Sequence, residues 1–116
     1  MTRDMKPRRS CLSVPASSAR MQAKAATLEA DQVLFDLEDA TAPTEKAGAR
    51  SIVVDSLKSL DFGRRAVAVR VNGVDTPWCY RDVVDVVEPA GDRLDTVILP
   101  KVESAADVTF LDRLLC

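Results

Sequence analysis

Four short apolar runs divide the chain, at 10–14, 33–35, 67–71 and 96–99. The last three are rich in β-branched residues and are mostly apolar rather than alternating. This pattern is typical of parallel strands that are covered on both faces. The first run is weaker and is assigned to a strand mainly by its position. We therefore predict four buried, parallel strands.

The segments between these runs carry apolar residues at helical spacing. The predicted stripes are Met21, Ala25 and Leu28; Ala49, Val53, Leu57 and Leu60; Tyr80, Val83, Val84 and Val87; and Val108, Leu111 and Leu115. The candidate N-terminal caps are Ser17 or Ser18, Thr44 after Pro43, Thr76 before Pro77, and Ser104 with Asp107 as a capping box. Gly63 and Pro89 are predicted to mark where the second and third helices stop.

Strand and helix alternate four times, which predicts right-handed crossovers on a parallel sheet. Two architectures fit this order, an open doubly wound sheet and a (β/α)8 barrel. Length favours the open sheet, because a barrel requires about 250 residues and this chain has 116. Against this, the last predicted helix runs to Cys116 without a cap or a polar tail, which indicates an interrupted chain. Both architectures stay open at this point.

Composition excludes several classes of function. The chain has 16 Lys and Arg against 18 Asp and Glu, and these charges are interspersed, so no basic surface for nucleic acid or for a membrane is expected. No apolar run approaches the ~20 residues of a membrane-spanning helix and no signal peptide is recognised, so we expect a cytoplasmic protein. The absence of histidine excludes a histidine base. Three scattered cysteines without a CxxC motif predict reduced thiols rather than a zinc site.

Unusual polar residues follow the predicted strands. They are Asp36, Glu38 and Asp39 after the second strand, Arg70 at the end of the third, and Lys101 and Glu103 after the fourth. Because the carboxyl ends of parallel strands meet at one edge of the sheet, where α/β proteins place their chemistry, we expect these side chains to converge.

Arg70 and the acidic residues each have a structural and a functional interpretation. Arg70 either pairs with Asp36 or Glu38, or it holds a substrate carboxylate or a developing enolate oxygen. The acidic residues either hold Mg²⁺ directly or hold the water molecules around it. In the structural alternative, Glu38 pairs with Arg70 and Asp39 caps the following loop.

Other polar and aromatic positions also leave two interpretations open. Lys24, on the first predicted helix, is either a solvated residue or a phosphate contact. Lys101 and Glu103 form either a local pair or a helix cap. Gly73 is predicted to take a positive φ in a turn, and Trp78 to pack between a helix and the barrel wall.

Four blocks of the sequence resemble a known family: RSCLSVPASS, DQVLFDLEDATAPTEKAGAR, VAVRVNGVDTPWCYRD and VILPKVESAADV. In order and spacing they are similar to the first half of the HpcH/HpaI aldolase/citrate lyase family. Within it they most resemble the CoA-ester lyases, namely the citrate lyase β-chain-like and malyl-CoA/β-methylmalyl-CoA lyases. The resemblance extends from Arg9 to Leu115.

The resemblance implies a (β/α)8 barrel assembled as a homo-oligomer, a trimer or a hexamer. Residues 1–116 would be its first four strand–helix units, so that the single lyase domain is incomplete at its C-terminus. The implied reaction is a Mg²⁺-dependent Claisen or aldol cleavage. In it a 3-hydroxyacyl-CoA such as malyl-CoA, methylmalyl-CoA or citryl-CoA yields an acyl-CoA and an oxo acid, while the metal polarises the oxo-acid carbonyl.

Site residues follow from the same resemblance. Arg70 corresponds to the family's substrate-binding arginine, for the oxo acid or the thioester enolate, and Glu38 and Asp39 to acidic residues near the metal's water molecules. Lys24 corresponds to a basic residue that contacts the CoA thioester, and Lys101 belongs to a family motif and is assigned to substrate binding. The family's direct Mg²⁺ ligands lie beyond residue 116, so the resemblance implies none in this chain.

Two residues depart from the family pattern. Ala16 stands where the family has glycine in a loop close to CoA, and Ser18 where malyl-CoA lyases often have a CoA-contacting arginine. Arg20 is the candidate to replace that arginine. Because the family's direct metal ligands lie beyond residue 116, we expect a fragment that has no lyase activity by itself. The alternative is a non-catalytic half barrel that binds CoA or interacts with another subunit.

Overall fold

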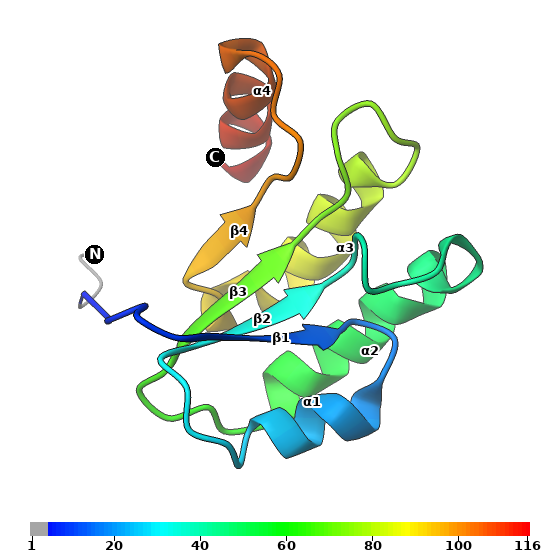
Figure 1. Ribbon diagram of the computed structural model, residues 1–116. Helices are drawn as coiled ribbons and strands as arrows, with labels where there is room; N and C mark the ends of the chain where they lie inside the picture. The colour runs from blue at the N-terminus through cyan, green and yellow to red at the C-terminus, as the bar shows by residue number, and fades with distance from the viewer. Residues whose placement is uncertain (1–4) are drawn as a thin grey trace.

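The computed structural model describes residues 5–116, which form one parallel sheet with helices packed against it (Figure 1). The strands are β1 (Cys11–Pro15), β2 (Gln32–Asp36), β3 (Ala66–Arg70) and β4 (Thr96–Ile98). The helices are α1 (Ala19–Ala25), α2 (Lys46–Ser59), α3 (Cys79–Ala90) and α4 (Ala105–Leu115), with the 3-10 turns η1 (Pro43–Glu45) and η2 (Gly91–Arg93). The predicted alternation of strand and helix is confirmed.

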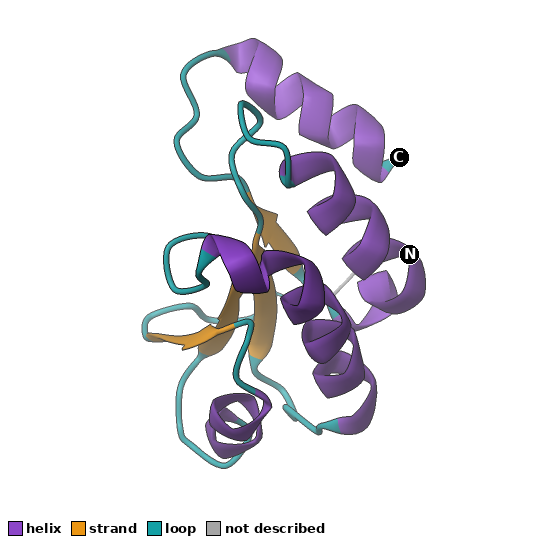
Figure 2. Cartoon of the chain, turned by 90° about the vertical axis from the view of Figure 1, so that its right-hand side faces the viewer, coloured by secondary structure: helices purple, strands orange, loops and turns teal. Residues whose placement is uncertain are grey.

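The strands lie in the sheet in chain order, β1-β2-β3-β4, and all neighbours are parallel. In a doubly wound sheet, the order in which strands are added reverses direction at least once. This reversal places helices on both faces of the sheet. Here every crossover leads to the next strand in the same direction across the sheet. Right-handed crossovers therefore place the helices on one face, as Figure 2 shows. The open doubly wound sheet that length favoured is thus excluded. The arrangement is that of the first four units of a barrel.

The core lies between the sheet and the helices. Phe35 of β2 has no exposed surface and belongs to the same buried cluster as Val53 of α2 and Val86 of α3. Its ring also meets the ring of Phe62 edge-on, with 5.6 Å between the ring centres. Removing an aromatic side chain from such a position costs about 3–5 kcal/mol in folding free energy, so this core fixes the position of β2.

The other face of the sheet carries the site. Side chains of a strand alternate between the two faces, and the strand register aligns Pro15, Asp36, Arg70 and Ile98 across the four strands at their carboxyl ends. Their neighbours in sequence, such as Phe35, point to the helices. The register therefore places a carboxylate beside a guanidinium on the helix-free face.

The caps predicted for the first two helices can be compared with the caps in the structure. Ser18 caps α1 as predicted, with its Oγ accepting a hydrogen bond from Met21 N at 3.2 Å. Thr44 does not cap α2, because it lies inside η1, and α2 starts at Lys46 without a side-chain cap. Pro43 accounts for this difference, since its fixed φ and missing N–H favour a tight turn before the regular helix.

Thr76 closes a turn instead of capping α3. Its Oγ1 donates to Gly73 O at 2.7 Å, and α3 begins later, at Cys79, and continues one residue past Pro89. Proline in the last turn removes a single hydrogen bond and does not stop the helix earlier. Gly73 does not take the predicted positive φ. A Cβ there would lie 2.9 Å from Oδ1 of the exposed Asp75, so a larger residue would require this side chain to move.

The outer helices present different faces from those predicted. In α1, Gln22 and Ala25 are buried while Met21 is 44% exposed, because the Gln22 amide donates to the carbonyl groups of Pro15 and Ala16, both at 2.9 Å. The other predicted stripe residues that are exposed are Leu28, Tyr80, Val108 and Leu115. None of the helices in the described part of the chain is long and apolar enough to cross a membrane.

The capping box predicted for α4 does not form. Ser104 makes no capping hydrogen bond, and Asp107 Oδ2 accepts instead from Glu103 N at 3.0 Å. In a capping box, Asp107 would accept from the N–H of Ser104. Here it accepts from the N–H of the preceding residue, Glu103.

Candidate active site

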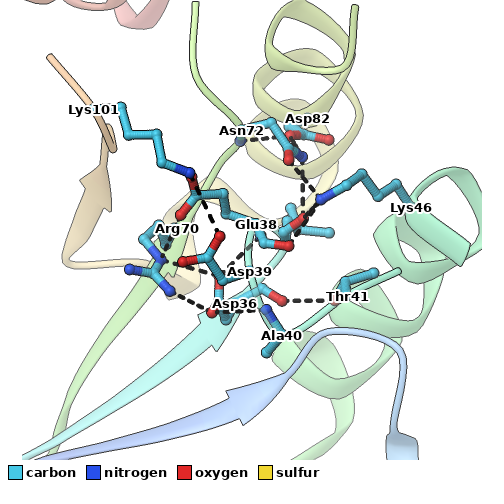
Figure 3. Close-up of polar contacts among 11 residues, drawn as sticks. Asp36, Glu38, Asp39, Ala40, Thr41, Lys46, Arg70, Asn72, Asp82 and Lys101 are labelled. Atoms are coloured by element: carbon cyan, nitrogen blue, oxygen red, sulfur yellow. Dashed lines mark hydrogen bonds and ion pairs between the residues drawn. The ribbon is translucent and has the colours of Figure 1, made fainter. Parts of the chain in front are cut away.

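The carboxyl end of the sheet brings together Asp36, Glu38, Arg70 and Lys101, which we call the ionic cluster (Figure 3). Asp36 and Arg70 are the last residues of β2 and β3 and are neighbours in register. Arg70 Nε and Nη2 donate to Asp36 Oδ1 and Oδ2 at 3.0 and 2.5 Å, which makes a bidentate pair. The ion pair expected for Arg70 on structural grounds is therefore present.

Each carboxylate oxygen of Asp36 also accepts a second hydrogen bond. Oδ1 also accepts from Glu38 N at 2.8 Å, and Oδ2 from Ala40 N at 3.3 Å. Burial acts to raise the pKa of Asp36, but the hydrogen bonds from Arg70 and from Glu38 N–H, with the charge of the guanidinium, hold this pKa below its ordinary value. The carboxylate is therefore ionised at neutral pH, and it orients both Arg70 and the loop after β2.

Glu38 is buried and lies between two cations. Its Oε2 accepts from Lys101 Nζ at 2.6 Å, and its Oε1 lies 3.6 Å from Arg70 Nε. Lys101 Nζ also lies 3.5 Å from the exposed Asp39. The hydrogen bond with Glu38, and then the charge of Asp39, raise the pKa of Lys101. The local pair of Lys101 with Glu103 is thus wrong, because Lys101 reaches the loop after β2 instead.

Lys101 has an unusual backbone conformation. Its φ of 52° lies in the left-handed region, which residues other than glycine rarely adopt. Such a conformation costs about 1–3 kcal/mol and is kept only where surrounding contacts hold it. Here it coincides with a contact that spans the sheet, from the end of β4 to Glu38 beyond β2.

Lys24 lies apart from the ionic cluster. It is exposed on α1 and, with Arg20, lines a groove of about 330 Å³ whose other walls include Leu12, Met21 and Leu28. No member of the ionic cluster lines this groove. The structure therefore separates two places: charged side chains at the strand ends, and a mostly apolar groove with two cations beside β1.

Sequence reasoning missed a buried polar group behind the ionic cluster, which we call the support network. It consists of Lys46 and Arg50 on α2, Asn72 after β3, and Asp82 on α3, all of which are buried. Figure 3 shows Lys46, Asn72 and Asp82 of this network. A signal was available in the sequence. Lys46 and Arg50 lie four residues apart on the helix face that carries the buried Val53, where a cation requires partners.

Among residues 5–116, no three acidic or cysteine side chains lie close enough together to hold a metal ion. The carboxylates of Asp36 and Glu38 are instead bonded to cations. The groups that the ionic cluster presents to solvent are its two cations, since the side chains of Arg70 and Lys101 are 28% and 69% exposed while Asp36 and Glu38 are buried. This arrangement suits recognition of a carboxylate or an oxyanion.

Comparison with known proteins gives consistent matches. A sequence profile of the HpcH/HpaI aldolase/citrate lyase family matches residues 9–115. An L-malyl-CoA/beta-methylmalyl-CoA lyase of Cereibacter sphaeroides is 47% identical over 110 residues, which cover 95% of this chain and 35% of the relative. A (3S)-malyl-CoA thioesterase of the same species is 47% identical over 108 residues, covering 93% and 37%. The chain thus spans about a third of the length of these curated relatives.

Solved structures agree on the fold. The citrate lyase beta subunit of M. tuberculosis, complexed with oxaloacetate and magnesium, has a TM-score of 0.73 at 38% identity, over 90% of this chain and 44% of that one. Malate synthase of Haloferax volcanii has a TM-score of 0.83 at 21% identity, over 97% and 36%, a likeness of fold alone. Both are barrels of the TIM type.

Proposed function

This chain belongs to the HpcH/HpaI aldolase/citrate lyase family, and from that premise we propose that it carries the oxo-acid side of a CoA-ester lyase site. The proposed reaction cleaves the C–C bond of a 3-hydroxyacyl-CoA, such as malyl-CoA, methylmalyl-CoA or citryl-CoA, to give an acyl-CoA and an oxo acid. The observation that carries the proposal is Arg70, which a buried carboxylate holds in a bidentate pair at the open end of the sheet.

Arg70 is proposed to bind the oxo-acid oxygens or the enolate oxygen of the thioester. Nε and Nη2 donate hydrogen bonds to Asp36, and no hydrogen bond from Nη1 is found among residues 5–116. A guanidinium that is held in place before the substrate arrives needs little reorganisation to stabilise developing negative charge. Asp36 would therefore keep Arg70 in the orientation that the reaction uses.

The remaining site residues are assigned in the same proposal. Lys101 would bind a substrate oxygen from β4, and Lys24 would bind a CoA phosphate at the rim of its groove. Glu38 and Asp39 would order water near a metal ion. A homo-oligomer stays a prediction from the family resemblance, and a cytoplasmic location stays a prediction from the apolar pattern of the sequence.

Mg²⁺ enters the proposal through the relatives, since the M. tuberculosis citrate lyase beta subunit is described with magnesium and oxaloacetate. The described residues of this chain do not fit a set of direct ligands, because Asp36 and Glu38 are committed to Arg70 and Lys101. We therefore propose that the direct ligands are not in this chain. The steps assigned here to Arg70 and Lys101 are anion binding alone.

A chimera tests the function. The 110 matching residues of the Cereibacter sphaeroides lyase are replaced by those of this chain, and the products from malyl-CoA are identified. Acetyl-CoA and glyoxylate are expected, whereas free CoA and malate would assign the thioesterase activity carried by the other relative. A folded chimera that forms neither product would overturn the proposal. The 116-residue chain assayed alone is expected to give no turnover.

The groove beside β1 favours a second candidate function, CoA binding without catalysis. Lys24 and Arg20 stand at an apolar groove that shares no residue with the ionic cluster, so it can act independently. Calorimetric titration of the chain with acetyl-CoA tests this function. Binding that is lost in Lys24→Glu, together with an inactive chimera, would favour the binding module over the lyase.

A further inference from the structure

We infer that Lys46 and Asp82 are positioning residues, which hold the loop after β2 and the end of β3 at a fixed separation behind the ionic cluster. The inference rests on the proposed function for its catalytic meaning. The side chains concerned act on the backbone next to Glu38 and Arg70, from the side of the helices (Figure 3). In the proposed function, substrate would approach from the opposite side.

Lys46 binds the backbone of the loop after β2. Its Nζ donates to Leu37 O and Glu38 O, both at 2.8 Å, and to Asn72 Oδ1 at 2.7 Å. Three acceptors use all three protons of an ammonium group, and the residue is 5% exposed. The Trp78 ring covers it from one side, 5.1 Å from Nζ. This lysine is therefore occupied in the structure and is not a free base.

Asn72 joins the two strand ends. It lies two residues after Arg70, and its Nδ2 donates to Leu37 O at 3.1 Å and to Asp82 Oδ2 at 2.6 Å. Its backbone N–H also donates to Asp82 Oδ2 at 2.9 Å. Because its amide side chain contacts both Lys46 and Leu37, a shift of the chain after β3 is transmitted to the loop after β2.

Asp82 fixes Asn72 to the helix layer. It has no exposed surface, and its Oδ1 accepts from Arg50 Nε at 2.8 Å. Arg50 and Lys46 stand one turn apart on α2, so one helix supplies both cations of the support network. The network therefore ties α2 and α3 to the backbone that carries the site.

As a result, the backbone N–H and the backbone C=O of Glu38 are both held by hydrogen bonds with side chains. Its N–H donates to Asp36 Oδ1 and its C=O accepts from Lys46 Nζ, both at 2.8 Å. Rotation of this backbone would break one of the two hydrogen bonds. The Cα atom of Glu38 is therefore held in place, and the side chain reaches Lys101 and Arg70 from this position.

Packing alone does not account for this arrangement. Burial lowers the pKa of Lys46, against the charges of Asp82 and Glu38, so the charged ammonium carries a cost in desolvation at this position. Apolar residues of similar volume often replace buried ionic groups without loss of stability. The bonds of Lys46 to the carbonyl groups of the loop are what an apolar residue could not provide.

The test compares Lys46→Met with Ser56→Ala in the 116-residue chain. Ser56 is a matched control, since it is also buried on α2 and bonds a buried side chain, Gln22, at 2.5 Å, away from the ionic cluster. Amide hydrogen exchange is measured by NMR at Glu38 and at Phe35 in the centre of β2. In Lys46→Met, exchange at Glu38 is expected to rise about tenfold relative to that at Phe35. In Ser56→Ala, the two amides are expected to change together.

Titration with oxaloacetate adds a functional measurement. Lys46→Met is expected to weaken binding about tenfold, and Ser56→Ala to leave it unchanged. In an Arg70→Lys background, the effect of Lys46→Met is expected to shrink, because the positioned group is already gone. Equal loss of stability in both variants, with no selective exchange at Glu38, would overturn the inference.

Two further measurements keep the outcomes distinct. If the wild-type chain does not bind oxaloacetate, the proposed function fails, while the exchange at Glu38 still decides the positioning role. If Lys46→Met does not fold, Asp82→Asn replaces it, since it keeps the shape of the side chain. This variant is expected to raise exchange at Asn72 and Glu38, and unchanged exchange at both would contradict the inference.

Discussion

Asp36 binds four residues of the site through one carboxylate and one carbonyl group. The carboxylate holds Arg70 of β3 and the N–H groups of Glu38 and Ala40, while its carbonyl oxygen accepts from Thr41 Oγ1 at 2.8 Å. Breaking a buried ion pair by removing one partner leaves the other charge uncompensated. Asp36 therefore contributes to folding stability as well as to the geometry of the site.

Asp36→Asn is expected to lose about 3 kcal/mol of folding free energy at pH 7. The pKa of Asp36 is lower in the folded than in the unfolded chain, so its contribution is present above about pH 4 and is lost as the pH falls through the folded-state pKa. Urea unfolding of both proteins at pH 7, 5 and 3 measures the difference. The gap should narrow at pH 3, and a constant gap would contradict this assignment.

Arg70→Lys is expected to lower kcat of the chimera on malyl-CoA by about 100-fold, because lysine cannot reproduce a bidentate pair with Asp36. The exposed Arg64, changed to lysine, is the control and should retain activity. Steady-state kinetics separate kcat from KM. A rise in KM alone would place Arg70 in substrate binding and not in stabilisation of the transition state.

At the level of residues, the sequence predicted which charged side chains meet but not all of their partners. Asp36, Glu38, Arg70 and Lys101 were expected together because they follow parallel strands, and strand ends are readable from apolar runs. Asn72, next to the turn predicted at Gly73, was not identified as a partner. The contact of Asn72 with Lys46 depends on how α2 packs against the sheet, and no local sequence pattern predicts this packing.

Arg65 shows how an element can be stabilised from outside itself. Helix α1 is short, and its C-terminal carbonyl groups lack partners within the helix. The guanidinium of Arg65, just before β3, donates to the carbonyl oxygens of Ala25, Ala26 and Leu28 at 2.6–2.9 Å. A cation is also favourable at the negative end of the helix dipole. Arg65 therefore holds α1 against the start of β3.

Arg65→Ala is expected to lower the free energy of unfolding by about 2 kcal/mol, because several carbonyl groups lose a charged donor together. Arg64→Ala, at the exposed neighbouring position, is the control and should change stability by less than about 0.5 kcal/mol. Urea unfolding followed by circular dichroism measures both. Similar midpoints for the two variants would show that solvent replaces Arg65 as the donor.

At the level of elements, strands were predicted more accurately than helix starts. Strand positions follow from continuous apolar runs, whereas a helix start depends on which of several nearby groups takes the first N–H groups. Pro43 diverted the chain into η1, and Thr76 bonded backward to Gly73. These outcomes depend on turn geometry, which the candidate caps alone did not specify.

At the level of the whole molecule, the helix-free face of the sheet is partly apolar. Leu34 of β2 and Ile98 of β4 are half-buried on this face, where Leu34 pairs with Ser13 and Ala68 in the register and Ile98 pairs with Arg70. Within residues 5–116, β1 and β4 each pair with one neighbour only. Strand edges of this kind are templates for pairing with another chain.

The 116-residue chain is therefore expected to self-associate at micromolar concentration. The double variant Leu34→Lys and Ile98→Lys places two like charges on the helix-free face and should shift the chain toward monomer. Sedimentation velocity at several concentrations measures the distribution. Ser59→Lys, on the exposed end of α2, is the control for added charge alone. Equal association of wild type and double variant would exclude this face as the contact.

Overall topology was the least accessible from the residues themselves. The alternation of strands and helices fitted two architectures, and chain length favoured the wrong one, because length does not state in which direction each crossover moves. The family resemblance implied the barrel, and the strand order β1-β2-β3-β4 agrees with it. The periodicity of single elements contains no information on their order in space.

That strand order bears on how the chain forms during synthesis. Each strand after β1 pairs with the strand that left the ribosome just before it, so β2, β3 and β4 each find their first neighbour already synthesised. At about 5–20 residues per second, a whole strand–helix unit emerges within seconds. Arg70, by contrast, emerges well after Asp36. Until it arrives, the nascent chain carries an acidic strand end that lacks its counter-charge.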